Sequence, residues 1–221
     1  KLKRELSYWS CFPEVKPLPK DFTEGENTYG SACEIKVELN KEETRQLLQD
    51  VSQAYRTQIN DVLLTALVMT ISSWTKEEVV YLELEGHGRE DIREGIDISR
   101  TLGWFTSIFP LYLKLKGEDL GEYLKEIKEQ LRAVPSKGIG YGILKYFGEQ
   151  ENAGRLNGTK AELSFNYLGQ WDVSLQREGL FSFVTEMMGI PIALNNRRTH
   201  LIDINSRIIE GKFEASWGYS C

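Results

Sequence analysis

The chain has 221 residues, 41% of them hydrophobic, which is enough to build a core, so we expect a globular protein. Its formal net charge is −6 and its basic residues are dispersed, so no nucleic-acid-binding surface is expected. No stretch approaches the roughly 18 to 20 apolar residues of a membrane span, and residues 1–5 are unlike a secretory signal, so we expect no membrane association and a cytoplasmic location.

The first quarter of the chain combines a linker, a strand and a helix. Apolar residues at helical spacing indicate the end of a helix over residues 1–9, and three prolines within residues 11–30 indicate an extended linker. Alternating apolar and charged residues predict a half-buried strand over residues 32–39. Asn40 is then expected to cap a helix over residues 41–55.

Regular elements continue through the middle of the chain. The apolar residues of 60–74 predict a helix that is buried on most sides. A strand is expected over residues 79–84 and another over 105–116, followed by an amphipathic helix over 120–133 that ends before Pro135.

The last third of the chain is expected to be rich in strands. One strand is predicted over residues 161–168, and two more over 201–209 and 212–218 form a hairpin around Glu210 and Gly211. Strands and helices alternate without a regular βαβ repeat. We therefore predict the α/β class, with a mixed-sheet α/β sandwich rather than a doubly wound parallel sheet.

Three glycines, Gly138, Gly140 and Gly142, are spaced like part of a dinucleotide-binding fingerprint. That fingerprint must follow a strand and open a helix, whereas these glycines follow a helix and Pro135. We interpret the segment instead as a loop that needs close backbone approach, followed by a short helix near Leu144.

Cysteine and histidine are scarce. Cys11, Cys33 and Cys221 are widely spaced and odd in number, so we expect reduced thiols rather than disulfides or a zinc site. The chain has only two histidines, and we expect His200, which lies in a polar segment, to be solvated. No metal site is predicted.

Glu85 is the first candidate catalytic residue. It ends the strand at 79–84, and a carboxylate among apolar strands can acquire a pKa suited to a general base. The alternative is a structural ion pair with Arg89 or Arg100. His87 could share a face with Glu85 and orient it, or could be an ordinary exposed or hydrogen-bonded loop residue.

Tyr167 is the second candidate. It lies near the end of the strand at 161–168, where its hydroxyl could donate to a developing enolate or act as an acid. A core tyrosine with a satisfied hydroxyl is the alternative. From the residues alone, these patterns indicate no more than an acid/base site in an α/β domain.

Five segments, read together and in order, resemble the signature blocks of epimerization domains in nonribosomal peptide synthetases. Residues 85–90 (Glu-Gly-His-Gly-Arg-Glu) match the block most diagnostic of epimerization over condensation. The other four segments are residues 55–64, 100–106 with Pro110, 135–142 and 165–172 (Phe-Asn-Tyr-Leu-Gly-Gln-Trp-Asp).

This resemblance implies one lobe of a chloramphenicol acetyltransferase-like fold, whose active site lies between two similar lobes. Residues 31–221 would be the C-terminal lobe, truncated at both ends, and residues 1–30 the helix end and linker that connect the lobes. The family's His-His-x-x-x-Asp-Gly motif has no counterpart here and would belong to the missing N-terminal lobe. The isolated chain is therefore expected to be inactive.

The resemblance also implies a reaction. An aminoacyl or peptidyl group arrives as a thioester on the 4′-phosphopantetheine arm of a peptidyl carrier protein, and its α-carbon is inverted from L to D by removal and return of a proton. No cofactor is bound directly. Glu85 would be the acid/base and Tyr167 a donor, supported by His87, Asn166 and Arg89, while Glu90, beyond two glycines, would be solvated.

Two other functions remain open. A condensation domain has the same fold but forms amide bonds, so the chain could be a lobe of an amide-forming acyltransferase. The lobe could also be non-catalytic and only dock a carrier protein.

Overall fold

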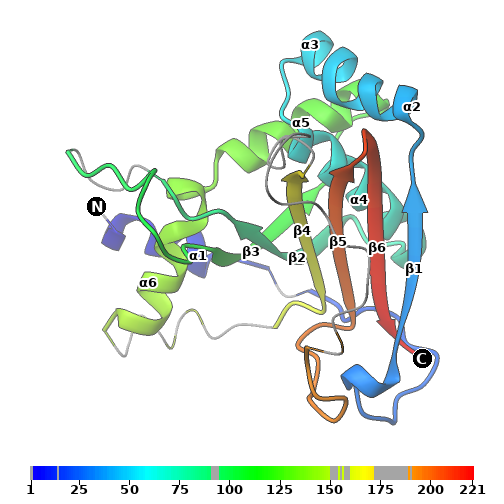
Figure 1. Ribbon diagram of the computed structural model, residues 1–221. Coiled ribbons are helices and arrows are strands. Elements are labelled where there is room, and N and C mark those ends of the chain that lie inside the picture. The colour runs from blue at the N-terminus through cyan, green and yellow to red at the C-terminus, as the bar shows by residue number, and fades with distance from the viewer. Residues whose placement is uncertain are drawn as a thin grey trace. The chain divides into compact units, whose positions relative to one another are not determined.

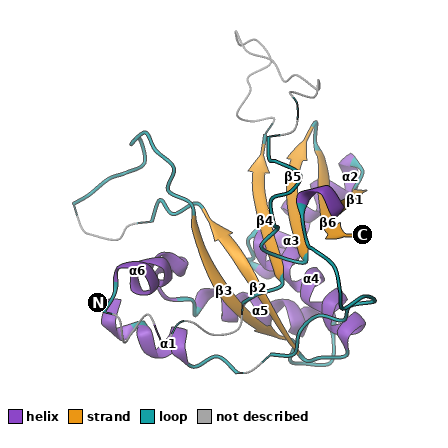
Figure 2. Ribbon diagram, turned by 90° about the horizontal axis from the view of Figure 1, so that it is seen from below, coloured by secondary structure: helices purple, strands orange, loops and turns teal. Residues whose placement is uncertain are grey.

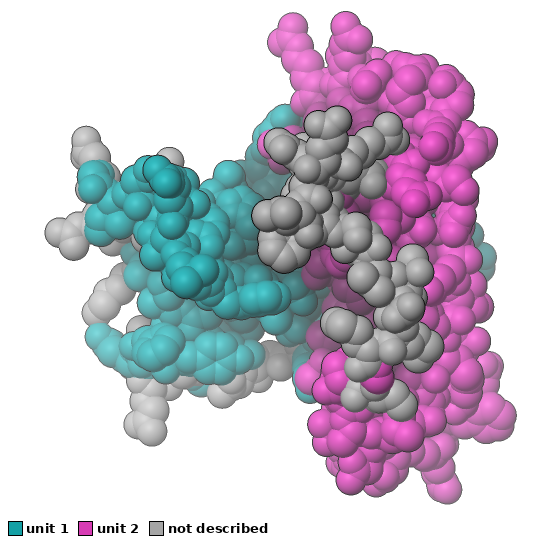
Figure 3. Space-filling view, in the orientation of Figure 1, with its two compact units in different colours: residues 1–18, 60–161 teal, residues 19–59, 162–221 magenta. Residues whose placement is uncertain are grey.

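The computed structural model describes residues 2–13, 15–90, 95–149, 160–171 and 191–221, together with residues 154, 156 and 189. Its helices and strands are labelled in Figure 1. The chain divides into two compact units, shown in separate colours in Figure 3. Unit 1 comprises residues 1–18 and 60–161, and unit 2 comprises residues 19–59 and 162–221.

Unit 1 is built around an antiparallel hairpin of β2 (Val79–Gly86) and β3 (Ser107–Lys114). The helices around it are α1 (Leu6–Ser10), α4 (Ile59–Thr75), α5 (Leu120–Arg132) and α6 (Ile139–Phe147), with 3-10 turns at Leu2–Arg4 and Pro135–Gly138. Alternate β2 residues are buried, as the strand pattern predicts. The predictions of a helix at 60–74, strands at 79–84 and 105–116 and a helix at 120–133 are confirmed within a few residues.

Helix α5 is attached to the end of β3 through one side chain. Gln130 accepts a hydrogen bond from the backbone nitrogen of Lys114 (2.9 Å) and donates one to its carbonyl oxygen (2.7 Å). Asp119 caps the helix by accepting from the backbone nitrogen of Glu122. Ile127 is fully buried. These contacts fix the helix beside the hairpin, which Figure 2 shows from below.

Unit 2 contains a four-stranded mixed sheet in the order β1-β6-β5-β4 (Figure 1). The strands are β1 (Ala32–Glu38), β4 (Leu163–Gln170), β5 (Ile202–Ile209) and β6 (Lys212–Ser220). Only the β4–β5 pair of this sheet is parallel. The predicted hairpin of β5 and β6 is confirmed, and its turn places Glu210 and Gly211 at positive φ, as two-residue hairpin turns require.

The helix predicted after β1 is confirmed, although its middle turn is wider than an α-helix. It consists of α2 (Lys41–Arg45), a π-helical turn (Gln46–Asp50) and α3 (Val51–Tyr55), and a 3-10 turn (Tyr29–Ser31) precedes β1. Asn40 and Glu43 cap each other's backbone nitrogens at its start. The Thr44 hydroxyl, which is buried, accepts from the backbone nitrogen of Phe213 at 2.9 Å, so the helix is held against β6.

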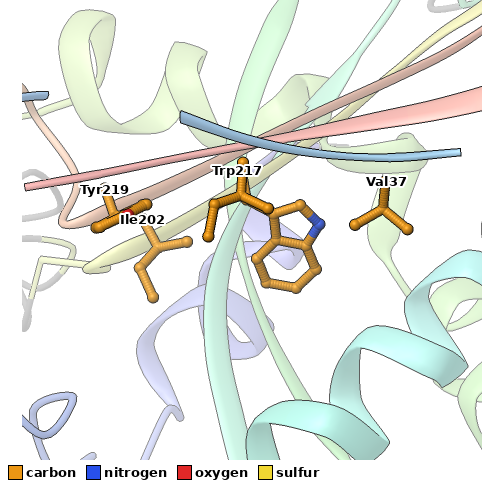
Figure 4. Close-up of a pocket in the computed structure, with 5 residues that line it drawn as sticks. Val37, Ile202, Trp217 and Tyr219 are labelled. Atoms are coloured by element: carbon orange, nitrogen blue, oxygen red, sulfur yellow. The ribbon is translucent and has the colours of Figure 1, made fainter. Parts of the chain in front are cut away.

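The expected half-burial of the strand at 32–39 holds for Cys33 and Leu39 but is wrong for its two central apolar side chains. Ile35 is 54% exposed and Val37 51% exposed. Together with three neighbours they line an apolar groove of about 240 Å³ (Figure 4); the lining residues are Ile35, Val37, Ile202, Trp217 and Tyr219. Because β1 pairs only with β6 among the described strands of unit 2, its apolar side has neighbours on one flank alone.

The expectation of three reduced thiols is also wrong. Cys33 and Cys221 form a disulfide, with a Cα–Cα distance of 5.9 Å, and Cys11 is free and exposed. The antiparallel register of β1 and β6 pairs Cys33 with Tyr219, which brings Cys221 within disulfide range. The two cysteines lie 188 positions apart along the chain, so the sequence alone does not indicate that they are close in space.

None of the described helices is both long and apolar enough to cross a membrane.

Candidate functional site

Glu85 is the next-to-last residue of β2, opposite Ile108 of β3. Leu84 before it is buried, and Glu85 is half-buried. Gly86 ends the strand, and a Cβ added there would lie 3.2 Å from the Ser107 hydroxyl and 3.8 Å from the Lys137 carbonyl oxygen. The strand therefore ends in a crowded position directly beside the candidate base.

Arg89 organises the loop that follows β2. Its Nη1 donates to the carbonyl oxygens of Ile98 (2.7 Å) and Thr101 (2.9 Å), and its Nη2 donates to that of Gly103 (3.0 Å). Its guanidinium carbon also lies 4.4 Å from the centre of the Phe105 ring. Arg89 thus uses its planar donors to fold the β2–β3 loop.

Gly88 lets this loop close. Its φ is +65°, and a Cβ added there would be 1.6 Å from the carbonyl oxygen of Phe105. No side chain fits in that space. The loop conformation beside Arg89 therefore requires glycine at this position.

His87 contacts Glu90 and the backbone of Arg89. Its Nδ1 accepts from the Arg89 backbone nitrogen at 3.0 Å, and its Nε2 lies 3.1 Å from Oε1 of Glu90. In this arrangement Nδ1 is the acceptor, so Nε2 carries the proton. The His87 side chain is 66% exposed, which fits the alternative of a hydrogen-bonded loop histidine.

Glu90 is not the solvated residue that its position beyond two glycines suggests. Its side chain is only 18% exposed, and its second oxygen, Oε2, lies 2.8 Å from Nζ of Lys137. One carboxylate therefore joins the loop after β2 to the turn before α6. No local sequence pattern indicates this pairing, because the two residues belong to different elements.

The turn before α6 has an unusual backbone. Ser136, Lys137 and Gly138 are consecutive residues at positive φ (46°, 49° and 87°). For the two residues with side chains this conformation costs on the order of 1–2 kcal/mol each. The expected close approach of the backbone is confirmed at Gly138, where a Cβ would be 2.0 Å from the Phe109 ring. The expectation of a loop is wrong for Gly140 and Gly142, which lie within α6.

A buried carboxylate holds the same turn from its other side. Glu5 is 8% exposed, and its Oε1 accepts a hydrogen bond of 2.8 Å from the Ser136 hydroxyl. A Cβ on Gly140 would be 2.0 Å from Oε2 of Glu5. Glu5 precedes α1, so the start of the chain takes part in fixing this turn.

Tyr167 and Asn166 lie on β4, in unit 2, whereas Glu85, His87 and Arg89 lie in unit 1. Burial raises the pKa of the Tyr167 hydroxyl, so it remains protonated at neutral pH and can donate. The carbonyl oxygen of Asn166 accepts from the Ser206 hydroxyl at 3.1 Å. Asp172, the last residue of this motif, lies outside the described residues.

The register of β4 changes directly after Tyr167. The ladder to β5 runs evenly to Tyr167 and Ser206 and then shifts before Gln170, and Gly169 has a φ of 85°. Such bulges change the direction of neighbouring side chains and are common beside functional sites. The predicted strand at 161–168 is confirmed.

The expectation that His200 is solvated is wrong. His200 is 8% exposed, and its Nδ1 lies 3.2 Å from Oδ1 of Asp203. Arg198 lies 2.7 Å from Oδ2 of Asp203, and the Ser164 hydroxyl donates to Oδ1 at 2.7 Å. Burial opposes ionisation of Asp203, but hydrogen bonds from His200, Ser164 and Arg198 outweigh it and lower the pKa to about 2.

Within the described residues, no group of three or more histidine, cysteine, aspartate or glutamate side chains could hold a metal ion.

The family model described as "Condensation domain" matches residues 1–220. The chain belongs to the condensation-domain family. It is 40% identical to chondramide synthase cmdD of Chondromyces crocatus, over 99% of this chain and 6% of that protein. It is 39% identical to surfactin synthase subunit 2 of Bacillus subtilis (strain 168), over 99% of this chain and 6% of that protein. The chain thus spans only a small part of these relatives.

Two solved structures agree with this fold. The epimerization domain from the third module of tyrocidine synthetase B superposes with a TM-score of 0.89 at 38% identity, over 99% of this chain and 50% of that one. The X-domain from teicoplanin biosynthesis gives a TM-score of 0.69 at 13% identity, over 99% of this chain and 49% of that one, which shows the fold alone. The expected α/β class and the resemblance to nonribosomal peptide synthetase domains are confirmed.

Proposed function

We propose that this chain is half of an epimerization domain that inverts the α-carbon of an aminoacyl or peptidyl thioester. The observation that carries the proposal is the match to an epimerization domain, with a TM-score of 0.89 and 38% identity. A condensation domain that mediates chain release from the enacyloxin polyketide synthase gives 0.67 at 12%. At 12% identity the second match shows the fold alone, so the proposal rests on the first match.

Glu85 is the proposed acid/base. It stands at the end of β2, beside a glycine and a loop that is folded by Arg89. A thioester carbonyl makes the neighbouring α-proton removable, because the electron pair left on carbon is delocalised onto oxygen. Glu85 takes that proton from one face, and an acid on the opposite face, which the other half of the domain supplies, returns a proton to the carbon and completes the inversion.

Tyr167 is the proposed donor to the enolate oxygen. Burial raises the pKa of its hydroxyl, which keeps the proton available at neutral pH. Asn166 lies beside it on β4, and His87 and Arg89 support the loop next to Glu85. These three are proposed as supporting residues.

The proposed substrate arrives on a peptidyl carrier protein, attached through 4′-phosphopantetheine, and no cofactor binds to the chain itself. The solved epimerization domain is about twice the length that this chain covers. We propose that the remaining half supplies the His-His-x-x-x-Asp-Gly motif and that residues 31–221 form the C-terminal lobe, with residues 1–30 leading into it. The proposed location is the cytoplasm.

The test is α-proton exchange in deuterated water, with an L-aminoacyl carrier-protein thioester and the domain completed by its other half. Wild type is expected to incorporate deuterium and to form the D isomer. Glu85→Gln is expected to lose both by a factor on the order of 10²–10⁴, the usual contribution of a general acid/base. The matched control is Glu83→Gln, which neutralises a half-buried carboxylate two residues earlier on the same face of β2.

Two alternatives are separate outcomes of this experiment. A wild type that exchanges nothing but joins two carrier-bound groups would support condensation, which the description of the matching family model favours. A wild type that does neither yet binds the carrier protein would support a docking role. Equal loss in the Glu83 and Glu85 variants would remove Glu85 from the proposed role.

A further inference from the structure

We propose that Lys137 is a positioning residue for Glu85. It acts through the left-handed turn Ser136–Gly138 and through Glu90, and it holds the end of β2 in place. The inference rests on the proposed function of Glu85. It goes beyond that function because it assigns a role to a residue that touches no reacting atom.

The first support is the backbone of the turn. Ser136 and Lys137 both adopt positive φ although neither is glycine, a conformation that persists only where its surroundings enforce it. The surroundings are identifiable. Gly138 packs directly on the Phe109 ring, and Ser136 donates to the buried Glu5.

The second support is the place where this turn rests. The Lys137 carbonyl oxygen lies 3.8 Å from the position of a Cβ on Gly86, the residue after Glu85. Phe109, on which Gly138 packs, pairs with Leu84, the residue before Glu85. The turn therefore packs on Phe109 of β3 and lies next to Gly86, the residue after Glu85.

The third support is the ion pair. The Lys137 ammonium lies 2.8 Å from Glu90, whose other oxygen lies 3.1 Å from His87. The turn is thereby connected to the loop that leaves β2. Although 75% of the Lys137 side chain is exposed, its partner Glu90 is only 18% exposed, so one end of the ion pair is shielded from solvent.

The experiment compares Lys137→Asn with Lys137→Arg in the completed domain, using the exchange assay. Asparagine tolerates positive φ, so this variant removes the ammonium and keeps the turn. We expect the maximal exchange rate to fall about tenfold with KM changed less than about twofold, because a small displacement of a catalytic group lowers the rate more than binding. Lys137→Arg is expected to restore most of the rate.

The matched control is Lys76→Asn. Lys76 also has a positive φ (60°), but its ammonium donates to the carbonyl oxygen of Ser73 in the helix that it follows. The Lys76→Asn variant is expected to catalyse α-proton exchange at the wild-type rate. Should Lys137→Asn fail to fold, Glu90→Gln removes the same ion pair from the other side and is expected to lower the rate equally.

A second readout does not depend on catalysis. Backbone amides of residues 84–90 are expected to exchange hydrogen faster in Lys137→Asn than in wild type or Lys76→Asn. Unchanged rates and unchanged amide exchange in Lys137→Asn, beside an inactive Glu85→Gln, would overturn the positioning role alone. A wild-type domain that shows no α-proton exchange would overturn the proposed function. In that case, amide protection in Lys137→Asn equal to that of wild type would also reject the structural role of Lys137.

Discussion

Arg198 places a guanidinium nitrogen 2.7 Å from the carboxylate of Asp203, and Arg198 is almost completely buried. Another of its nitrogens lies 3.2 Å from the side-chain oxygen of Asn27. The pair joins the segment before β5 to β5 itself. The arrangement keeps Asp203 ionised under acidic conditions that protonate most carboxylates.

The first prediction concerns the acid stability of this cluster. The folded-state pKa of Asp203 is about 2, below its ordinary value of 3.8, so its contribution is complete above about pH 4 and is lost as pH falls towards 2. Because Asp203 is partly exposed, we expect a contribution of only about 1 kcal/mol. Urea unfolding of wild type should lose this stability between pH 4 and 2.

The matching variant is Asp203→Asn. It should lack the Asp203 component of the pH dependence and should be less stable at pH 7 by about 2–3 kcal/mol, because Arg198 stays buried without its anion. The control is Asp21→Asn, an exposed carboxylate of unit 2, which should unfold like wild type. An Asp203→Asn protein as stable as wild type at pH 7 would contradict this account.

The second prediction concerns the loop folded by Arg89. Arg89→Lys keeps the charge but cannot reproduce three bonds to the carbonyl oxygens of Ile98, Thr101 and Gly103 together with the ring contact. Charge-assisted hydrogen bonds contribute roughly 1.5–3 kcal/mol each when buried, and this loop is partly exposed. We therefore expect amides of residues 98–105 to exchange about tenfold faster, as measured by mass spectrometry.

The control for this loop is Arg100→Lys. Arg100 belongs to the same loop and is exposed. It should leave the exchange rates unchanged. Equal protection in wild type and Arg89→Lys would mean that the carbonyl contacts of Arg89 do not stabilise the loop.

The positions of most helices and strands can be predicted from local sequence patterns. The alternation of β2, the cap at Asn40 and the turn at Glu210 and Gly211 are each encoded within a few residues, and each is predictable. The end of β2 is likewise recognisable as a glycine-containing, charged segment. These features depend on periods and turn chemistry that operate over short distances.

The partners of the site residues are not predictable in this way. The pairing of Glu90 with Lys137 depends on how a loop meets a later turn. The polar neighbours of His200 predict a solvated side chain. The imidazole instead lies beside the carboxylate of Asp203, three residues further on, in a buried cluster. In both cases the three-dimensional packing, rather than local composition, decides exposure.

The third prediction concerns Tyr167. Tyr167→Phe removes the hydroxyl and preserves the ring, so the fold should remain intact. If the hydroxyl stabilises the enolate, the rate of α-proton exchange should fall about 10²-fold to 10³-fold, the usual cost of losing one oxyanion donor. Tyr219→Phe, a tyrosine of β6 in the same unit, is the control and should exchange like wild type. A fully active Tyr167→Phe would assign this tyrosine to packing.

The last prediction concerns the disulfide between Cys33 and Cys221. Denatured, unreduced protein should react with an alkylating reagent at Cys11 alone, and reduced protein at all three cysteines. In the chain-entropy treatment, a cross-link over 188 residues stabilises the fold by up to about 5 kcal/mol. Reduction should therefore lower the Tm of wild type and of Cys11→Ser. The Tm of Cys33→Ser should be lower from the outset and should not change on reduction. Three reactive thiols in the unreduced protein would contradict the disulfide. Strand β1 would then be held to β6 by its strand pairing alone, without a covalent link.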